Sequence, residues 1–146
     1  MNSLFGYSRY PKDGVIENGH PKTVLGMHVP KFPNLYFVIG QQALNPQTNV
    51  TYVCMKQAEH IASVIREAEK TACTVHGSPS FAEFWTKKCG NDANGKVWHR
   101  SKNWYNNHGT ADLSGFYWGF YLDYFQYVDK ARKFISFEPR HRGSKL

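Results

Sequence analysis

The chain has 146 residues, and 18 Lys and Arg against 11 Asp and Glu give it a formal net charge of +7. This length suits one domain around one core, because two independent domains would each be marginal. The sequence has no run of about 18 apolar residues and no signal-peptide pattern, so we expect a cytoplasmic protein that does not enter a membrane. The positive charge favours an anionic partner, either nucleic acid or a nucleotide.

The first third of the chain predicts short strands after an irregular arm. Residues 1–33 are rich in Gly, Pro and Tyr, and their four prolines break any long regular element. Apolar and β-branched runs predict strands at Val24–Val29, Asn34–Ile39 and Val50–Cys54. The polar residues 45–49 have turn chemistry, so the second and third strands should form a hairpin.

The middle of the chain predicts two helices around one strand. Between Lys56 and Lys70 the apolar residues recur at helical spacing; they are Ala58, Ile61, Ile65 and Ala68. Thr71–Val75 reads as a short buried strand. A second helix should run from Ser80 to Cys89, because Ser80 and Glu83 have the spacing of a capping box.

The last third is polar and then aromatic. Residues 90–113 predict a long loop with a tight turn at Asn94-Gly95. We expect a helix over Leu122–Phe134, while residues 116–121 fit a helix or a strand. The predicted fold is α+β, a mixed and mainly antiparallel sheet packed by two or three helices. It forms a single compact domain over residues 1–137, followed by a basic C-terminal tail at 138–146.

One candidate site lies where a strand gives way to a helix. His76 and Ser78 directly precede the capping residue Ser80. A helix N-terminus has unpaired amides and a partial positive charge, so these side chains would surround a seat for a phosphate. The alternative is an ordinary helix entry with His76 as a structural residue.

A second candidate site is the segment from Lys87 to His108, in which cations alternate with aromatic rings. Cations hold phosphates while rings stack on bases, so this mixture suits nucleic acid or a nucleotide. A long loop pinned to the core by its rings is the alternative. The predicted ligand-binding residues are Lys96, Trp98, Arg100, Lys102, Trp104 and Tyr105.

Two further functions stay open. His76-Gly77-Ser78 nearly recurs as His108-Gly109-Thr110, and two imidazoles can act as acid and base on a phosphodiester. His76 and His108 would then be catalytic residues of a metal-independent phosphodiesterase or ribonuclease, with Thr110 binding the ligand. Alternatively, the chain is a structural or assembly subunit, and its aromatic segment from residue 116 to 137 forms the core or a homo-oligomer interface.

The cysteines and the C-terminus give weaker signals. Cys54, Cys73 and Cys89 are odd in number and lack a CxxC pair, so we expect free thiols. We expect no metal and no cofactor. The last three residues, Ser144-Lys145-Leu146, match a peroxisomal address and leave that compartment as an alternative.

Overall fold

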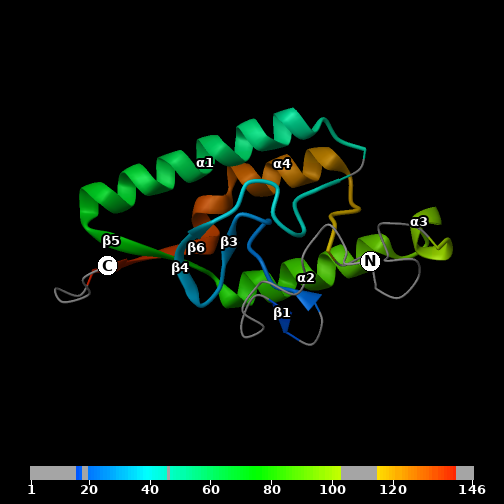
Figure 1. Ribbon diagram of the computed structural model, residues 1–146, viewed down its shortest axis with the longest axis horizontal. Helices are drawn as coiled ribbons and strands as arrows, with labels where there is room; N and C mark the ends of the chain where they lie inside the picture. The colour runs from blue at the N-terminus through cyan, green and yellow to red at the C-terminus, as the bar shows by residue number, and fades with distance from the viewer. Residues whose placement is uncertain (1–15, 18–19, 46, 103–114, 141–146) are drawn as a thin grey trace, which may run out of the picture.

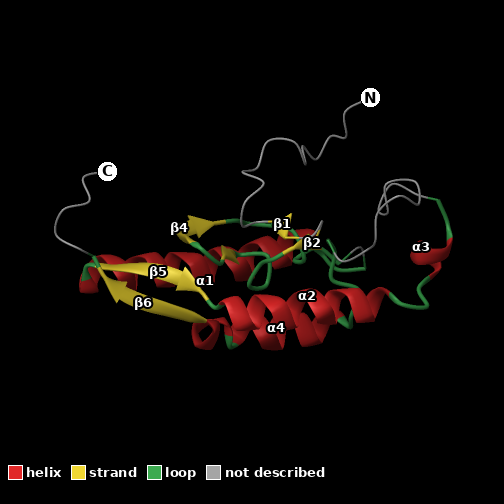
Figure 2. Cartoon of the chain, turned by 90° about the horizontal axis from the view of Figure 1, so that it is seen from below, coloured by secondary structure: helices red, strands yellow, loops and turns green. Residues whose placement is uncertain are grey.

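A computed structural model describes residues 16–17, 20–45, 47–102 and 115–140 of the chain (Figure 1). The fold is α+β, as the sequence predicts, and its helices lie beside short antiparallel strand pairs (Figure 2). The helices are α1 (Val50–Thr71), α2 (Pro79–Ala93), the single turn α3 (Val97–Arg100) and α4 (Tyr121–Asp129), which a 3-10 turn, η2 (Ala131–Phe134), follows.

The strands of the described residues form three antiparallel pairs rather than one continuous sheet. They are β1 (Ile16–Glu17) with β2 (His20–Pro21), β3 (His28–Val29) with β4 (Phe32–Tyr36), and β5 (Cys73–Gly77) with β6 (Ile135–Pro139). In the longest pair Val75 lies opposite Phe137. The β1–β2 and β3–β4 hairpins lie on one face of the helices (Figure 2).

Helix α1 begins six residues before the helix that periodicity predicts, so the strand expected over Val50–Cys54 is wrong. The side chain of Asn49 accepts a hydrogen bond from the amide of Tyr52, which caps the helix N-terminus. The helix then buries Val53, Gln57, Ile61, Val64 and Ala68 against the core. Tertiary burial of this face outweighs the β propensity of the first turn, and the predicted hairpin does not form.

The strands before α1 are shorter than predicted. Backbone at Leu25 and Gly26 turns through the left-handed region, so β3 contains only the last two residues of the expected Val24–Val29 strand. Strand β4 starts at Phe32 and ends at Tyr36, and Ile39 adopts a left-handed conformation with φ of 55°. The chain therefore leaves the strand three residues earlier than the apolar run suggests.

Helix α2 confirms the predicted second helix but starts with another cap. Ser78, and not Ser80, is the N-cap residue, and its hydroxyl accepts from the amide of Phe81. Glu83 pairs with Lys22 and Lys87 instead of the helix amides. The helix also continues through Ala93, so it takes up the first part of the segment that the sequence predicts as a loop.

The predicted C-terminal helix is divided in two. Helix α4 ends at Asp129, and η2 carries the chain to Phe134. Strand β6 was not predicted. It runs to Pro139, and the amide of Arg140 donates to the carbonyl oxygen of Ala72. The first residues of the expected tail are therefore part of a strand pair.

The main core lies between α1, α2 and α4 and is rich in aromatic rings. Trp85, Tyr117 and Tyr124 are fully buried, and the rings of Trp85 and Tyr117 stack with centroids 5.0 Å apart. Most of the aromatic C-terminal segment thus fills the core. None of the described helices combines the length and apolar character that crossing a bilayer requires.

Candidate functional site

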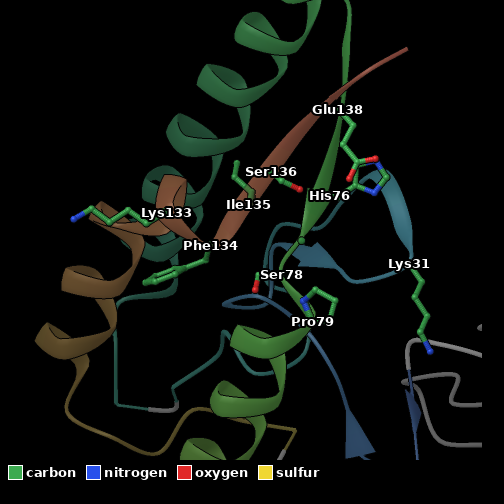
Figure 3. A pocket seen from close by; sticks show the side chains of 10 residues that line it. Lys31, His76, Ser78, Pro79, Lys133, Phe134, Ile135, Ser136 and Glu138 are labelled. Atoms are coloured by element: carbon green, nitrogen blue, oxygen red, sulfur yellow. The ribbon is translucent and has the colours of Figure 1, made fainter. Parts of the chain in front are cut away.

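The predicted seat at the start of α2 opens into a pocket of about 450 Å³. Figure 3 shows His76, Ser78 and Ser136 around it, while the side chains of Lys31 and Lys133 at its margins extend away from it. The imidazole Nε2 of His76 lies 3.0 Å from Thr74 Oγ1 and 3.5 Å from Glu138 Oε2. The structure therefore brings His76 and Ser78 together, but it also places a carboxylate beside the imidazole.

Few amides at the start of α2 are open to a ligand. Pro79 has no N–H, and the amide of Phe81 donates to the Ser78 hydroxyl. The Ser80 hydroxyl lies 3.0 Å from the Ser78 hydroxyl. Of the first three amides only that of Ser80 is left, so this helix end offers a phosphate less than the sequence suggests.

The predicted basic segment lies at the other end of α2. The described side chains of Lys96, Arg100 and Lys102 are exposed and pair with no carboxylate of the described part of the chain. Lys87 and Lys88, in contrast, pair with Glu83 and Asp92. Trp98 belongs to α3, but its side chain lies outside the described residues, as do Trp104, Tyr105, His108 and Thr110.

The two predicted sites are thus separated by the length of α2. A helix of 15 residues is about 22 Å long at 1.5 Å per residue. The His76 pocket and the basic segment could both contact one ligand only if it were long and extended. The predicted pair of His76 and His108 is not placed, because His108 lies outside the described residues.

Sequence reasoning missed a strained crossing of two loops in front of α1. Residues 24–27 and 39–43 cross with their backbones in contact. The contact is so close that a Cβ on Gly40 would overlap the carbonyl oxygen of Gly26. Left-handed backbone gathers here at non-glycine positions, with φ of 57° at Leu25, 55° at Ile39 and 70° at Gln42. Such strain persists only where surrounding contacts hold it, and it is common at functional sites.

The chain after this crossing leads directly into the N-terminus of α1. The amides of Val50 and Thr51 have no acceptor among the described residues, since the Asn49 cap serves Tyr52 and Val53. The hydroxyl of Thr48, two residues before Val50 in the chain, is buried and lacks a hydrogen-bond partner in the described part. Two open amides and an unpartnered hydroxyl can bind a phosphate, and the partial positive charge of a 22-residue helix adds to this.

Exposed aromatic rings lie beside this helix end. Tyr52, in the first turn of α1, is 41% exposed, and its ring contacts that of Phe125 in α4 at a centroid distance of 4.8 Å. Tyr121 contacts the same Phe125 ring at 6.5 Å, and Phe120 contacts Tyr121 at 5.0 Å. Figure 1 shows that α1 and α4 begin at the same end of the molecule. A planar ring system could stack on this aromatic surface.

Residues 115–119 connect this helix end to the basic segment. The carbonyl oxygen of Gly119 accepts from the side chain of Asn45, and the amide of Tyr117 donates to Leu44. On its other side the ring of Tyr117 lies 5.8 Å from Lys88 Nζ in α2. Through the buried residues Asn45 and Tyr117, the chain before α1 is therefore connected to the C-terminal half of α2.

This region could have been found from two signals in the sequence. Asn45 and Asn49 are the residue types that cap helices and form local turns, and Asn49 lies three residues before Tyr52. Gly40 closes an apolar run, where a close backbone contact is common. Because the composition of Val50–Cys54 also favours a strand, the sequence does not predict that α1 begins at Val50.

Within the described residues, the remaining reactive groups form no metal centre. No three His, Cys, Asp or Glu side chains gather in the described residues at a distance that could hold an ion. Cys54, Cys73 and Cys89 are free thiols, and burial raises the pKa of the Cys89 thiol well above its usual range. Cys89 is therefore a core residue and not a nucleophile.

Comparison with known proteins places this fold within larger enzymes. No protein-family model matches the sequence, and no curated protein matches it. Among solved structures, cyclohexanone monooxygenase from Rhodococcus sp. Phi1 bound to NADP+ aligns over 82% of this chain with a TM-score of 0.71 and 23% identity. Steroid monooxygenase bound to NADP aligns over 82% with a TM-score of 0.70 and 18% identity.

These alignments establish a shared fold over part of the larger proteins. The chain covers 24% of the cyclohexanone monooxygenase and 23% of the steroid monooxygenase. A closed structure of cyclohexanone monooxygenase gives a TM-score of 0.72 at 22% identity, again with 24% of that chain covered. The chain therefore spans about a quarter of the length of these monooxygenases.

Proposed function

We propose that this chain binds nicotinamide adenine dinucleotide phosphate (NADP), in support of a monooxygenase reaction. The observation that carries the proposal is the fold: most of the chain superimposes on monooxygenases whose structures contain NADP. The net charge of +7 suits a ligand with several phosphates. Because the chain spans about a quarter of these enzymes, we assign it nucleotide binding and assign no step of oxygen chemistry to its residues.

The N-terminus of α1 is the place where we expect a phosphate to bind. The open amides of Val50 and Thr51 and the unpartnered Thr48 hydroxyl supply donors there. The exposed rings of Tyr52 and Phe120 offer a surface on which a planar ring of the nucleotide can stack. Helix α3, which contains Arg100, lies at the same end of the molecule (Figure 1), and with the flanking Lys96 and Lys102 it adds positive charge there.

The pocket beside His76 is a second candidate for a phosphate. Its hydroxyl groups and the imidazole are suitable donors, but Glu138 and the missing N–H of Pro79 weaken it. Nucleic-acid binding and phosphodiester cleavage receive no support from the monooxygenase relatives, so neither is preferred. Self-association through the exposed rings of α4 remains a prediction.

A proline substitution gives a sharp test of the α1 N-terminus. Val50→Pro removes one open amide from the first helical position, where proline is tolerated. Asn49 has ψ of 106°, a conformation that a following proline allows. Val50→Ala is the matched control, because it trims the same half-exposed side chain and keeps the amide.

The experiment measures NADPH and NADP+ affinity of the full chain by calorimetry, with NAD+ and AMP as competitors. We expect Val50→Pro to weaken NADPH binding about tenfold, the effect of one charge-assisted hydrogen bond, and Val50→Ala to leave it within twofold. His76→Ala in the same assay examines the second pocket. Absence of NADPH and NADP+ binding by the unmodified chain would overturn the proposal, and tighter binding of a short oligonucleotide would favour nucleic acid instead.

A further inference from the structure

Two buried polar side chains, Gln57 of α1 and Tyr124 of α4, connect the strained loops in front of α1. Gln57 is 0% exposed and Tyr124 is 1% exposed. The amide of Ile39 donates to Gln57 Oε1 at 2.7 Å, and Gln57 Nε2 donates to the Tyr124 hydroxyl. The Tyr124 hydroxyl then donates to the carbonyl oxygen of Leu25 at 2.9 Å. We call this continuous set of hydrogen bonds the Gln57–Tyr124 relay.

Each end of the relay holds a residue in left-handed backbone. Leu25 has φ of 57° and Ile39 has φ of 55°, and both are L-residues without a backbone reason to adopt that region. Ile39 is also β-branched, which makes this conformation still less favourable. In this geometry the relay gives each of the two residues a buried hydrogen-bond partner, Gln57 for the Ile39 amide and Tyr124 for the Leu25 carbonyl oxygen.

The strain is placed where the two loops touch. Gly26 and Gly40, the residues directly after Leu25 and Ile39, pack backbone against backbone. A second buried set of hydrogen bonds fixes the far side of the crossing, where Gln42 Oε1 accepts from the amide and hydroxyl of Thr23. The indole of Trp85 donates to the carbonyl oxygen of Gln42 at 3.2 Å. The segment 39–43 is therefore held at both ends.

The segment that follows carries the donors of the nucleotide site. Residues 44–49 link the crossing to the N-terminus of α1, and Gln57 lies two turns further along that same helix. The hydrogen bond between the Ile39 amide and Gln57 therefore closes a loop of chain that begins at Ile39 and ends within α1. Without the relay, the crossing would lose the hydrogen bonds at Ile39 and Leu25 that hold the start of the segment leading to the amides of Val50 and Thr51.

We propose that Gln57 and Tyr124 are positioning residues that preorganise the nucleotide site at the N-terminus of α1. This inference rests on the proposed function. Neither side chain reaches the site itself, since both are buried in the core. They act on the ligand by holding the crossing, and hence the chain up to Asn49, in the binding geometry before the nucleotide arrives.

Tyr124→Phe is the decisive variant, because it keeps the ring and removes the hydroxyl that joins Gln57 to Leu25. Tyr127→Phe is the matched control: it removes a hydroxyl one turn along α4, and that hydroxyl bonds to no described residue. Val128→Ala is the control for stability, because it creates a cavity in the same helix and touches neither hydrogen bond. Gln57→Met replaces Tyr124→Phe if the latter does not fold.

The measurements are NADPH affinity and amide hydrogen exchange at Gln42 and Ala43, whose amides donate to Gly115 and Gly40. We expect Tyr124→Phe to weaken NADPH binding at least tenfold and to speed exchange at these two amides. The two controls should keep the affinity within twofold, even where Val128→Ala lowers the melting temperature as much. Unchanged affinity in Tyr124→Phe and Gln57→Met, or an equal loss in Val128→Ala, would overturn the inference.

The two proposals can fail separately. If the unmodified chain binds no NADPH, the proposed function fails, and hydrogen exchange still decides whether the relay holds the crossing. Faster exchange at Gln42 and Ala43 in Tyr124→Phe than in both controls supports the positioning role. Equal exchange in all three variants contradicts it.

Discussion

The Nε2 atoms of His28 and His60 lie 2.9 Å apart, so the two imidazoles share one hydrogen bond between β3 and α1. One ring donates from Nε2 and the other accepts there, which is possible while both rings are neutral. Burial, and then the nearby His60, lower the pKa of His28 to about 3. Burial, and then Arg132, lower the pKa of His60. The ring of Tyr36 in β4 packs edge-on against the imidazole of His28.

This pair predicts a loss of stability in mild acid. Below about pH 6.5 the unfolded chain binds protons that the folded pair does not, so the free energy of unfolding should fall as the pH drops from about 6.5 toward 3. For His28 the expected slope is about 1.4 kcal/mol per pH unit. Urea unfolding of the unmodified chain and of His28→Gln between pH 7 and 4 measures it. Parallel curves for the two proteins would contradict the prediction.

The loop crossing predicts opposite effects for two glycine substitutions. Gly40→Ala should destabilise the protein by about 3 kcal/mol, because its Cβ would overlap the Gly26 carbonyl oxygen and crowd the crossing. Gly90→Ala is the control: it lies within α2, and nothing lies within 4 Å of the added Cβ. We expect that change to stabilise the protein by about 0.5–1 kcal/mol. Thermal unfolding of both variants decides, and a harmless Gly40→Ala would show that the loops can separate.

The start of α2 predicts a difference between two serines. Ser78→Ala removes the hydroxyl that accepts from the Phe81 amide, and should cost about 1 kcal/mol. Ser80→Ala removes a hydroxyl that caps no amide, and its effect should stay within about 0.5 kcal/mol. Chemical denaturation of the two variants measures both. A larger loss in Ser80→Ala would restore the capping box that the sequence suggests.

The basic segment predicts a nucleotide affinity that depends on ionic strength. Replacing Lys96, Arg100 and Lys102 by Ala should weaken NADPH binding at low salt. The effect should be smaller at 0.5 M salt, where the Debye length falls to about 4 Å and exposed charges are screened. The control is the triple variant of Arg66, Lys70 and Lys130, which removes the same charge from exposed positions on α1 and at the end of α4. Equal weakening in both triple variants would show that the basic segment contributes only through the net charge of the protein and not through contacts with the nucleotide.

Elements whose residues interact with near neighbours in the chain can be predicted from the sequence alone. The spacing of Ile61 and Ala68 identifies α1, because a helix repeats every 3.6 residues whatever it packs against. Ser-Pro-Ser before an apolar run identifies the start of α2 to within two residues. The α+β class follows from these elements. His76 and Ser78 could be placed at one strand-to-helix turn for the same reason.

Where local preferences compete, contacts between distant parts of the chain determine which element forms. Val50–Cys54 has the composition of a strand, yet it is helical because Val53 and Gln57 complete a face that packs against α4. Strand β6 exists because residues 73–77 pair with it 58 or more positions later in the chain, a distance at which no local pattern gives a signal. The crossing at Gly26 and Gly40, and the relay through Gln57 and Tyr124, likewise join residues far apart in sequence. Their strained backbone is stable only because those distant contacts are all made at once.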